Sequence, residues 1–334
     1  MQTSKNLDLQ LEAARLLIDA GSQNLRQANV LAASDAMEEA SAILDMAEES
    51  TEEVLKLRAR VLNELGVVSQ RKNQLDQARD YHREASKMCD ELNARGIDFR
   101  GNGAATHLNL SSILVASGEL DEALEAGKKA IVLIEALRAD GQQGAEGLAL
   151  GAHQNMALIL ARKGELDSAD AEMTNAIELA KKLGEQGAPN ISVQAAQGCQ
   201  QLSVAMFEAQ KFDRALSWGR VAAELSEKAY EAHGQPVLGV YIVSQINLIS
   251  YHERLGQFAE AEDGLWKALE VAGNDAQIMR RGLAFYEACR KQADVRLEAG
   301  NLPREEVDEG YEEIKARIEA IGGLPALPES TPQA

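Results

Sequence analysis

The sequence is poor in the residues that interrupt helices and in those that favour sheets. Its 334 residues include six prolines, two of them before residue 300, and aromatic residues make up 4%. Alanine, leucine and the long polar side chains of glutamate, glutamine, lysine and arginine are abundant instead. Because these are the strongest helix formers, the composition predicts an all-α protein.

Cysteines and long apolar runs are also scarce. Cys89, Cys199 and Cys289 are far apart, form no CxxC motif and lie in helical patterns, which predicts buried, reduced thiols. The opening MQTSKNLDLQ has no apolar run behind a basic start, so we expect no signal peptide. No apolar stretch is long enough to span a bilayer. We therefore expect a cytoplasmic protein.

Positive charge is in deficit. The formal net charge of −19 argues against nucleic acid as a partner, because phosphate binding needs a basic surface. It favours encounter with a basic protein segment, for which the acidic run at 305–313 is a candidate dock or else a solvated helix face. Arg280, Arg281, Arg290 and Lys291 form a local basic patch, interpreted as a solvated helix face. Membrane contact is expected only indirectly or through this patch.

Motifs that carry chemistry are missing. The five histidines form no HxxxH or HExxH pair, and His107 and His153 are 46 residues apart, which indicates a shared packing position in a repeat. No nucleophile, base and orienting group can be named together. The sequence therefore predicts a non-enzymatic protein without catalytic residues, metal or cofactor.

A repeated phrase takes the place of such motifs. LVASGELDEALEAGKKAI at 114–131 returns as LARKGELDSADAEMTNAI at 160–177. Its two alanines, seven residues apart, recur at intervals of 45 or 46 residues. The five pairs are Ala78 and Ala85, Ala123 and Ala130, Ala169 and Ala176, Ala215 and Ala222, and Ala261 and Ala268. A fixed period of this size predicts a solenoid or another repeat array.

Each copy has the pattern of two helices joined by a tight turn. Apolar residues at spacings of three and four mark the first helix, and an apolar residue followed by the alanines marks the second. Glycine and asparagine tolerate the left-handed backbone that ends a helix, which predicts the turns. The turn positions are Asn73, Gly118, Gly164, Gln210 and Gly256.

These marks resemble the tetratricopeptide repeat, which has a small residue in its first helix, glycine at the turn and alanines in its second helix. The resemblance covers residues 22–320, although the usual unit is about 34 residues long. It implies an all-α, right-handed superhelical solenoid of helix pairs with repeats of about 46 residues, and a function in protein binding.

The resemblance divides the chain into three parts. Residues 1–21 are expected to form an N-terminal capping helix, residues 22–320 the superhelical array of about seven helix pairs, and residues 321–334 a disordered, Pro-rich tail. In the first unit we assign the alanine positions to Ala40 and Ala47, a shorter spacing than in later units.

After Ala261, the segment LAFYEACRKQADVRLEAGNLPREEVDEGYEEIKARI is expected to supply the last helix pair. Gly300 is expected to mark its turn, and Pro303 to lie in the first turn of its second helix, where proline is tolerated.

The segments between repeats are similar to those of kinesin light chains. After Ala176 and Ala222 they combine a long second helix, a Gly-containing break and then Pro189 or Pro236. Only LDLQLEAARLLIDA precedes the array, which is too short for the coiled coil of a motor subunit. The chain therefore resembles more the bacterial kinesin-light-chain-like proteins that accompany bacterial tubulin filaments, which implies a tubulin-like filament as partner and a cytoskeletal role.

The resemblance also implies a binding surface. By analogy with the family, first helices line a concave groove, and the residue before the Leu or Met of each first helix points into it. Side-chain amides at these positions can hydrogen-bond the main chain of an extended peptide. Alternatively, the amides only cap or pack between neighbouring helices. The candidate partner-binding residues at this position are Glu64, Asn109, Asn155, Gln201 and Asn247, and the adjacent groove candidates are Ser112, Arg162, Ser250 and Arg254.

Two functions follow from this surface. The first is a non-enzymatic scaffold or adaptor, in its specific form an accessory protein of a bacterial tubulin-like filament. The alternative is a signalling receptor or regulator whose groove binds a short peptide.

Overall fold

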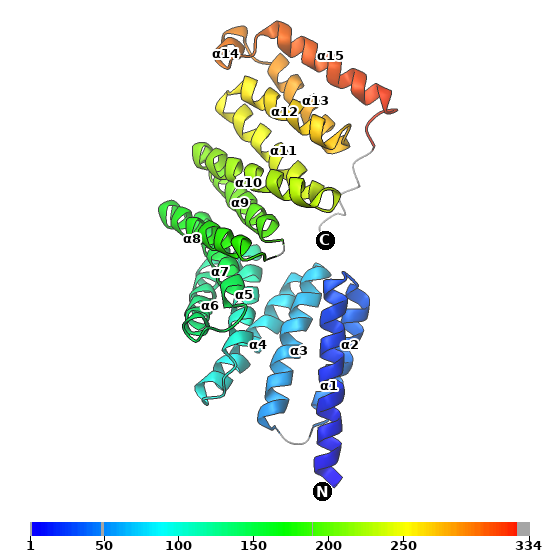
Figure 1. The fold of residues 1–334 in the computed structure, drawn as a ribbon, viewed down its shortest axis with the longest axis vertical. Coiled ribbons are helices and arrows are strands. Elements are labelled where there is room, and N and C mark those ends of the chain that lie inside the picture. Colours follow the sequence, from blue (N-terminus) through cyan, green and yellow to red (C-terminus); the bar gives the residue numbers. More distant parts are fainter. Residues whose placement is uncertain (1, 48–49, 189, 326–334) are drawn as a thin grey trace. The chain divides into compact units, whose positions relative to one another are not determined.

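The computed structural model describes residues 2–47, 50–188 and 190–325, and these form fifteen α-helices, one short 3-10 helix and no strand. The helices pack in consecutive pairs (Figure 1). The chain divides into two compact units, Met1–Leu179 and Ala180–Ala334, called unit 1 and unit 2 here. The predicted all-α solenoid of tetratricopeptide-type helix pairs is confirmed.

Unit 1 contains four first helices, each followed by a second helix. The first helices contact one another in series, α1 with α3, α3 with α5 and α5 with α7, so they share one face of the unit. Helix α8 runs across the boundary between the units. The bounds are α1 (Gln2–Arg26), α2 (Val30–Asp45), α3 (Glu52–Arg71), α4 (Leu75–Ala94), α5 (Arg100–Ala116), α6 (Leu120–Ala139), α7 (Ala145–Lys163) and α8 (Leu166–Glu185).

Unit 2 repeats the arrangement three times. Helix α9 packs on α10, α11 on α12 and α13 on α15, and the first helices α9, α11 and α13 again contact in series. The bounds are α9 (Ile191–Glu208), α10 (Phe212–His233), the 3-10 helix η1 (Gln235–Val237), α11 (Leu238–Leu255), α12 (Phe258–Ala272), α13 (Ala276–Arg290), α14 (Asp294–Ala299) and α15 (Arg304–Ala320).

The repeated alanines lie where the helices of a pair are closest. All ten have at most 1% of their surface exposed, and a longer side chain at any of them would force the helices apart. The five predicted turn residues all have a left-handed backbone, with φ between 59° and 84°. Both parts of the repeat interpretation are therefore confirmed.

The register predicted for the first unit is wrong by seven residues. Ala28 holds the left-handed turn between α1 and α2, with φ of 59°. The buried alanines that follow it at the repeat spacing are Ala33 and Ala40, both fully buried, whereas Ala47 lies beyond the end of α2. Because alanines occur at all three heptad-spaced positions, only the turn decides between the two registers. The first unit thus has the ordinary spacing of 45 residues to Ala78.

The turn of the last pair is also displaced. Asn301, with φ of 55°, takes the left-handed position, whereas Gly300 has φ of −92°. Gly300 is needed for a close approach instead, since a Cβ there would lie 2.4 Å from the Gly256 carbonyl oxygen. Pro303 is the N-cap of α15 and lies one residue before its first turn.

The predicted division at residues 21 and 320 stays a prediction. Helix α1 continues through residue 21 to Arg26 and packs against α2 and α3. Helix α15 ends at Ala320, residues 321–325 follow it outside any helix, and 326–334 lie outside the described residues.

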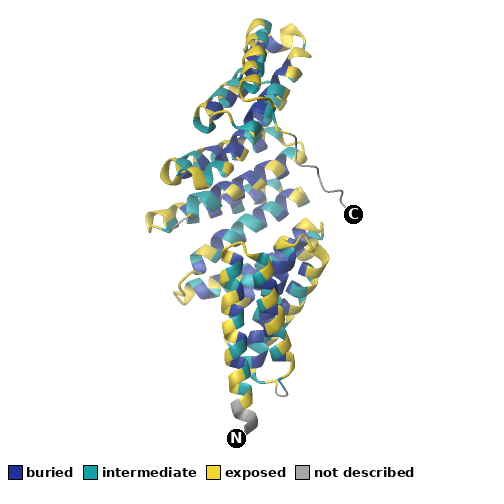
Figure 2. Ribbon diagram, turned by 90° about the vertical axis from the view of Figure 1, so that its right-hand side faces the viewer, coloured by how far each residue is buried: buried dark blue, intermediate teal, exposed yellow. Residues whose placement is uncertain are grey.

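Buried residues lie on the faces where helices meet (Figure 2). The clusters of unit 1 are mainly aliphatic, as at Leu57, Leu114 and Ile134, whereas that of unit 2 includes several fully buried aromatic rings. The three cysteines are buried and unpaired, as predicted. Burial raises the pKa of Cys89 to about 11 and that of Cys199 and Cys289 to about 12, which keeps the thiols protonated at neutral pH.

Candidate partner-binding surface

The candidate residues of unit 1 lie on the first helices α3, α5 and α7. The Asn109 amide Nδ2 on α5 donates to Asn63 Oδ1 on α3 at 3.0 Å. The Asn155 amide Nδ2 on α7 donates to Ser112 Oγ at 2.6 Å and to the main-chain carbonyl of Leu108 at 3.3 Å. The asparagines therefore link each first helix to the preceding one.

Arg162 extends this series, and Glu64 begins it. Arg162 Nη1, near the end of α7, donates to the Val115 carbonyl oxygen on α5 at 2.9 Å. Glu64 is half-buried on α3, and burial raises the pKa of its carboxyl group, opposed by the charges of Arg60 and Arg26. Asn109, Asn155 and Arg162 thus connect neighbouring first helices of unit 1, the role that the packing interpretation assigns to them.

Unit 2 uses the same positions differently. Gln201 on α9 is exposed and Asn247 on α11 is half-buried. Within the described residues, neither side chain makes a hydrogen bond to the protein. Their amide groups therefore remain available to a ligand.

Ser250 and Arg254, the other two candidates of unit 2, line a cavity of about 400 Å³. The helices α9, α11, α13 and α14 surround it, together with the start of α12. Its walls include the rings of Phe207 and Phe258. We call this cavity the arginine pocket, because Arg254, Arg281 and Arg296 all line it.

Each guanidinium group of the arginine pocket is held by a neighbour. That of Arg254 lies over the Phe212 ring, 4.8 Å from its centroid, and that of Arg296 lies 5.9 Å from the Phe258 centroid. Arg281 Nε donates to Ser250 Oγ at 3.0 Å, and its Nη2 forms an ion pair with Glu253. Aromatic faces and a charge-assisted hydrogen bond therefore fix the orientation of these groups.

The sequence placed Arg281 in a basic patch and so missed its part in the pocket. Its neighbour Arg290 lies elsewhere, 3.0 Å from Asp308 and over the Tyr311 ring at 4.3 Å. The patch is therefore divided among separate contacts. No local spacing could have indicated this, because Ser250 and Arg281 are 31 residues apart.

Within the part of the chain that the structure describes, no helix is long and apolar enough to cross a membrane.

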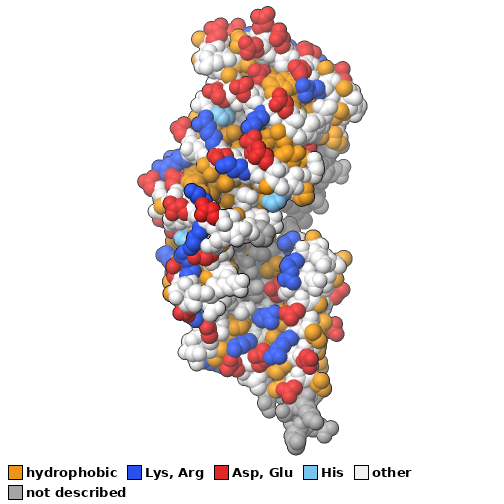
Figure 3. All heavy atoms as spheres, viewed as in Figure 1, with side chains coloured by type: hydrophobic (Ala, Val, Ile, Leu, Met, Phe, Trp, Pro, Cys, Tyr) orange, Lys and Arg blue, Asp and Glu red, His pale blue; other side chains and the backbone are white. Residues whose placement is uncertain are grey.

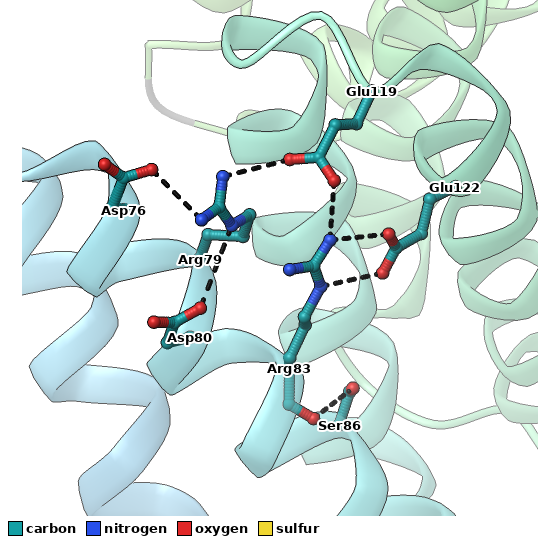
Figure 4. A network of polar contacts seen from close by, with 7 residues as sticks. All are labelled: Asp76, Arg79, Asp80, Arg83, Ser86, Glu119 and Glu122. Carbon is teal, nitrogen blue, oxygen red and sulfur yellow. Dashed lines mark hydrogen bonds and ion pairs between the residues drawn. The ribbon is translucent and has the colours of Figure 1, made fainter.

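The second helices of unit 1 are joined by ion pairs rather than amides (Figure 4). Arg83 on α4 binds Glu122 on α6 at 2.6 Å and Glu119, at the N-cap of α6, at 2.7 Å. Arg79 binds the same Glu119 at 3.1 Å and Asp76 at 3.0 Å. Since each charge has a partner, this network connects two repeats and is not a binding site in itself.

Elsewhere, ionisable side chains are paired or dispersed. His107 Nε2 lies 2.8 Å from Asp90, and His153 Nδ1 lies 2.6 Å from Glu172. Among the described residues, no group of three or more His, Cys, Asp or Glu side chains could hold a metal ion. Acidic and basic side chains are intermixed over much of the face seen in Figure 3, and acidic ones predominate at its upper end. The arginine pocket is thus a local positive site in an acidic chain.

Comparisons with known proteins concern mainly the fold. No curated protein matches the sequence. The quorum sensor NprR from B. thuringiensis is similar in structure, with a TM-score of 0.54 and 11% identity over 92% of this chain and 82% of NprR. RapI gives a TM-score of 0.50 and 16% identity over 92% of this chain and 99% of RapI. BtubC (BKLC) from P. vanneervenii gives 0.49 and 17% identity over 78% of this chain and 91% of BtubC.

A known protein family matches the part of the sequence that forms the repeat array. The profile of DUF6483, described as a family of unknown function, matches residues 37–319. This match runs from α2 to α15 and spans most of both units. The chain therefore belongs to the DUF6483 family.

Proposed function

We propose that this protein is a non-enzymatic adaptor that binds a segment of a protein partner along its first helices. One observation carries the proposal: Ser250 and Arg254, which the sequence analysis selected as groove candidates, line the same cavity in unit 2. Stacked helix pairs present extended surfaces of this kind to their partners. A cytoplasmic location stays the expectation.

The two units would contribute different contacts. In unit 2, Gln201 and Asn247 can donate to and accept from a peptide main chain. In unit 1, both hydrogens of the Asn155 amide are engaged by Ser112 and Leu108, so recognition there falls to its oxygen. The proposal therefore places most of the specificity in unit 2.

Two partner classes are open to this surface. The inter-repeat segments favour an accessory role at a bacterial tubulin-like filament, as their resemblance to light-chain repeats implies. A peptide-binding signalling receptor is the second candidate, supported by the fold shared with NprR, which is described as a quorum sensor. The receptor needs a groove along the first helices, whereas a filament could also be contacted by the convex face or by loops.

The first test replaces three asparagines. The variant Asn109→Ala, Asn155→Ala and Asn247→Ala is expected to weaken partner binding at least about tenfold. It removes the proposed ligand contact of Asn247 and the hydrogen bonds by which Asn109 and Asn155 align the first helices of unit 1, and a lost hydrogen bond costs about 1 kcal/mol. Partners are captured from the source cells with immobilised protein, and affinity is then measured on the purified partner by calorimetry. The matched control replaces three exposed amides elsewhere: Gln142, Asn175 and Gln277, each by Ala.

The control should bind as the unchanged protein does, and circular dichroism should show equal helix content in all three proteins. Unchanged affinity of the asparagine variant would contradict the groove. A second measurement separates the partner classes: a filament partner co-sediments with assembled tubulin-like polymer at a fixed ratio, whereas a receptor saturates with one soluble peptide.

A further inference from the structure

We propose that the arginine pocket receives a carboxylate group carried by the bound segment. The inference rests on the proposed function, because it names the chemistry that one cavity on that surface selects. It begins from charge: of the four charged side chains lining the pocket, Arg254, Arg281 and Arg296 are positive and only Glu253 is negative.

Among the described residues, no carboxylate outside the pocket forms an ion pair with its arginines. Glu253 pairs with Arg281. Within the described residues, Arg254 and Arg296 form no ion pair, and each contacts an aromatic ring instead. An aromatic face orients a guanidinium group without removing its charge. Two unneutralised guanidinium groups therefore face one cavity in a chain of net charge −19.

The geometry of the donors favours a carboxylate. Guanidinium groups present N–H donors in a planar fork that matches two carboxylate oxygens, and they are more weakly hydrated than an ammonium group. Stacking of Arg254 on Phe212 and anchoring of Arg281 by Ser250 reduce the rotamer freedom that binding would otherwise remove. The donors are thus arranged before the ligand arrives.

The size and lining of the cavity indicate which carboxylate fits. A volume of about 400 Å³ lies at the lower end of small-ligand sites, enough for a side chain or a chain end but not for a folded segment. The rings of Phe207 and Phe258 supply apolar wall against which the methylene groups of a glutamate can pack. The pocket therefore suits a single acidic residue or a C-terminus.

This local preference is opposite to that of the whole chain. A net charge of −19 attracts basic segments at long range and raises their encounter rate. At contact distance, the arginine pocket selects an acidic group. The segment expected to bind best thus carries basic residues together with one acidic residue positioned for the pocket.

The test uses defined probes and the full-length protein. The ¹⁵N-labelled chain is titrated with N-acetylated, C-amidated tetraglutamate, with the matching tetraglutamine, with an N-acetylated tetraglycine bearing a free C-terminus, and with inorganic phosphate. Arginine Nε–Hε signals report binding. Tetraglutamate or the free C-terminus, or both, should shift the signals saturably, and tetraglutamine should not.

Three variants identify the groups responsible. Arg254→Gln combined with Arg296→Gln should weaken binding of the carboxylate probe at least tenfold. Arg220→Gln, at an exposed arginine of α10 outside the pocket, should leave it unchanged. Glu253→Gln should tighten binding several-fold, because it removes the carboxylate that competes for Arg281. Circular dichroism verifies the fold of each variant.

Several results would overturn the inference: equal shifts with tetraglutamate and tetraglutamine, undiminished binding by the double arginine variant, or phosphate binding that is tighter than that of either carboxylate probe. The probes need no natural partner, so their outcome is independent of the asparagine test. A partner lost by the asparagine variant but retained by the double arginine variant would leave the adaptor function standing and remove only the carboxylate pocket.

Discussion

Unit 1 and unit 2 are built from the same helix-pair repeat, but their first helices make different polar contacts. In unit 1, successive first helices are joined by Asn109 and Asn155, and the second helices α4 and α6 are joined by Arg83. In unit 2 the alanine register persists to Ala268, but the face of α11 opens into the arginine pocket. At the candidate positions, unit 1 therefore uses its asparagines to connect helices, whereas the amides of Gln201 and Asn247 in unit 2 stay available for a ligand.

The cores differ in the same way. Unit 1 fills its interior with alanine and branched aliphatic residues, whereas unit 2 buries Tyr241, Phe258, Phe285 and Tyr286. Tyr286 fits only because Gly310 lies beside it: a Cβ at Gly310 would be 2.3 Å from the tyrosine ring. In unit 2, large rings therefore fill space between the helices alongside the repeated alanines.

The largest expected effect comes from removing one of these rings. Tyr286→Ala should lower the free energy of unfolding of unit 2 by about 3–5 kcal/mol, because it leaves a ring-sized cavity. It also deprives the Glu262 carboxylate, whose pKa burial raises, of a hydrogen bond at 2.6 Å. Urea titration followed by tryptophan fluorescence measures this, since both tryptophans, Trp218 and Trp266, lie in unit 2.

The counterpart in unit 1 is Leu114→Ala, a fully buried aliphatic position with an expected cost of about 2–5 kcal/mol. In a urea titration, this variant should lower the unfolding midpoint measured by circular dichroism and leave the midpoint measured by tryptophan fluorescence unchanged. If both probes moved together in both variants, the two units would unfold as one, and the comparison would not hold for stability.

A smaller effect separates the units by pH. His82 on α4 is fully buried against Gly66, and neither of its ring nitrogens has a hydrogen-bond partner among the described residues. Burial lowers its pKa to about 4, below the unfolded value of 6.5. As pH falls below 6.5, the unfolded chain takes up a proton at His82 before the folded chain does. The free energy of unfolding is therefore unaffected by His82 above pH 6.5 and decreases as pH falls towards 4.

At pH 5 the loss amounts to about 2 kcal/mol in unit 1. The measurement compares urea midpoints by circular dichroism at pH 7 and pH 5 for the unchanged protein and for His82→Leu, in which this pH dependence should disappear. Carboxylate titration affects both proteins alike and cancels in the difference. An equal pH dependence in the two proteins would show that His82 does not titrate as described.

The smallest effect concerns the ion pairs of the second helices. Arg83→Gln should destabilise unit 1 by about 0.5–1 kcal/mol at low salt, because its partners Glu119 and Glu122 remain 36% and 45% exposed. In unit 2, Lys267→Gln removes a single contact to Glu227 and should cost less. Both effects should vanish in 1 M salt, where the screening length is about 3 Å. A cost that salt leaves unchanged would point to packing instead.

The periodic features of the fold could be predicted from the sequence. Alanine at fixed intervals reflects the close approach of two helices, and glycine or asparagine at the turn reflects a left-handed backbone. Because both causes are local, these residues indicate the same structure in every repeat. The register of the first unit failed because Ala33, Ala40 and Ala47 satisfy the spacing equally well. Ala28, an unusual residue for a left-handed turn, gave no signal.

The candidate surface was only partly predictable for a related reason. Ser250 and Arg254 were selected from the sequence, but the repeat position of the asparagines alone did not separate the engaged Asn155 from the available Asn247, since both occupy the same place in their repeats. The difference lies in the preceding first helix, where Ser112 Oγ on α5 accepts a hydrogen bond from Asn155 on α7.

The sequence by itself determined the helix pairs, their period, the small residues between them and the negative charge of the chain. Each of these depends on residues close together in the chain or on a sum over all of them. Only the tertiary structure decided that Arg254, Arg281 and Arg296 share a cavity while Arg290 does not. Such a site depends on which distant side chains the packing brings within a few ångströms, and periodicity does not encode that.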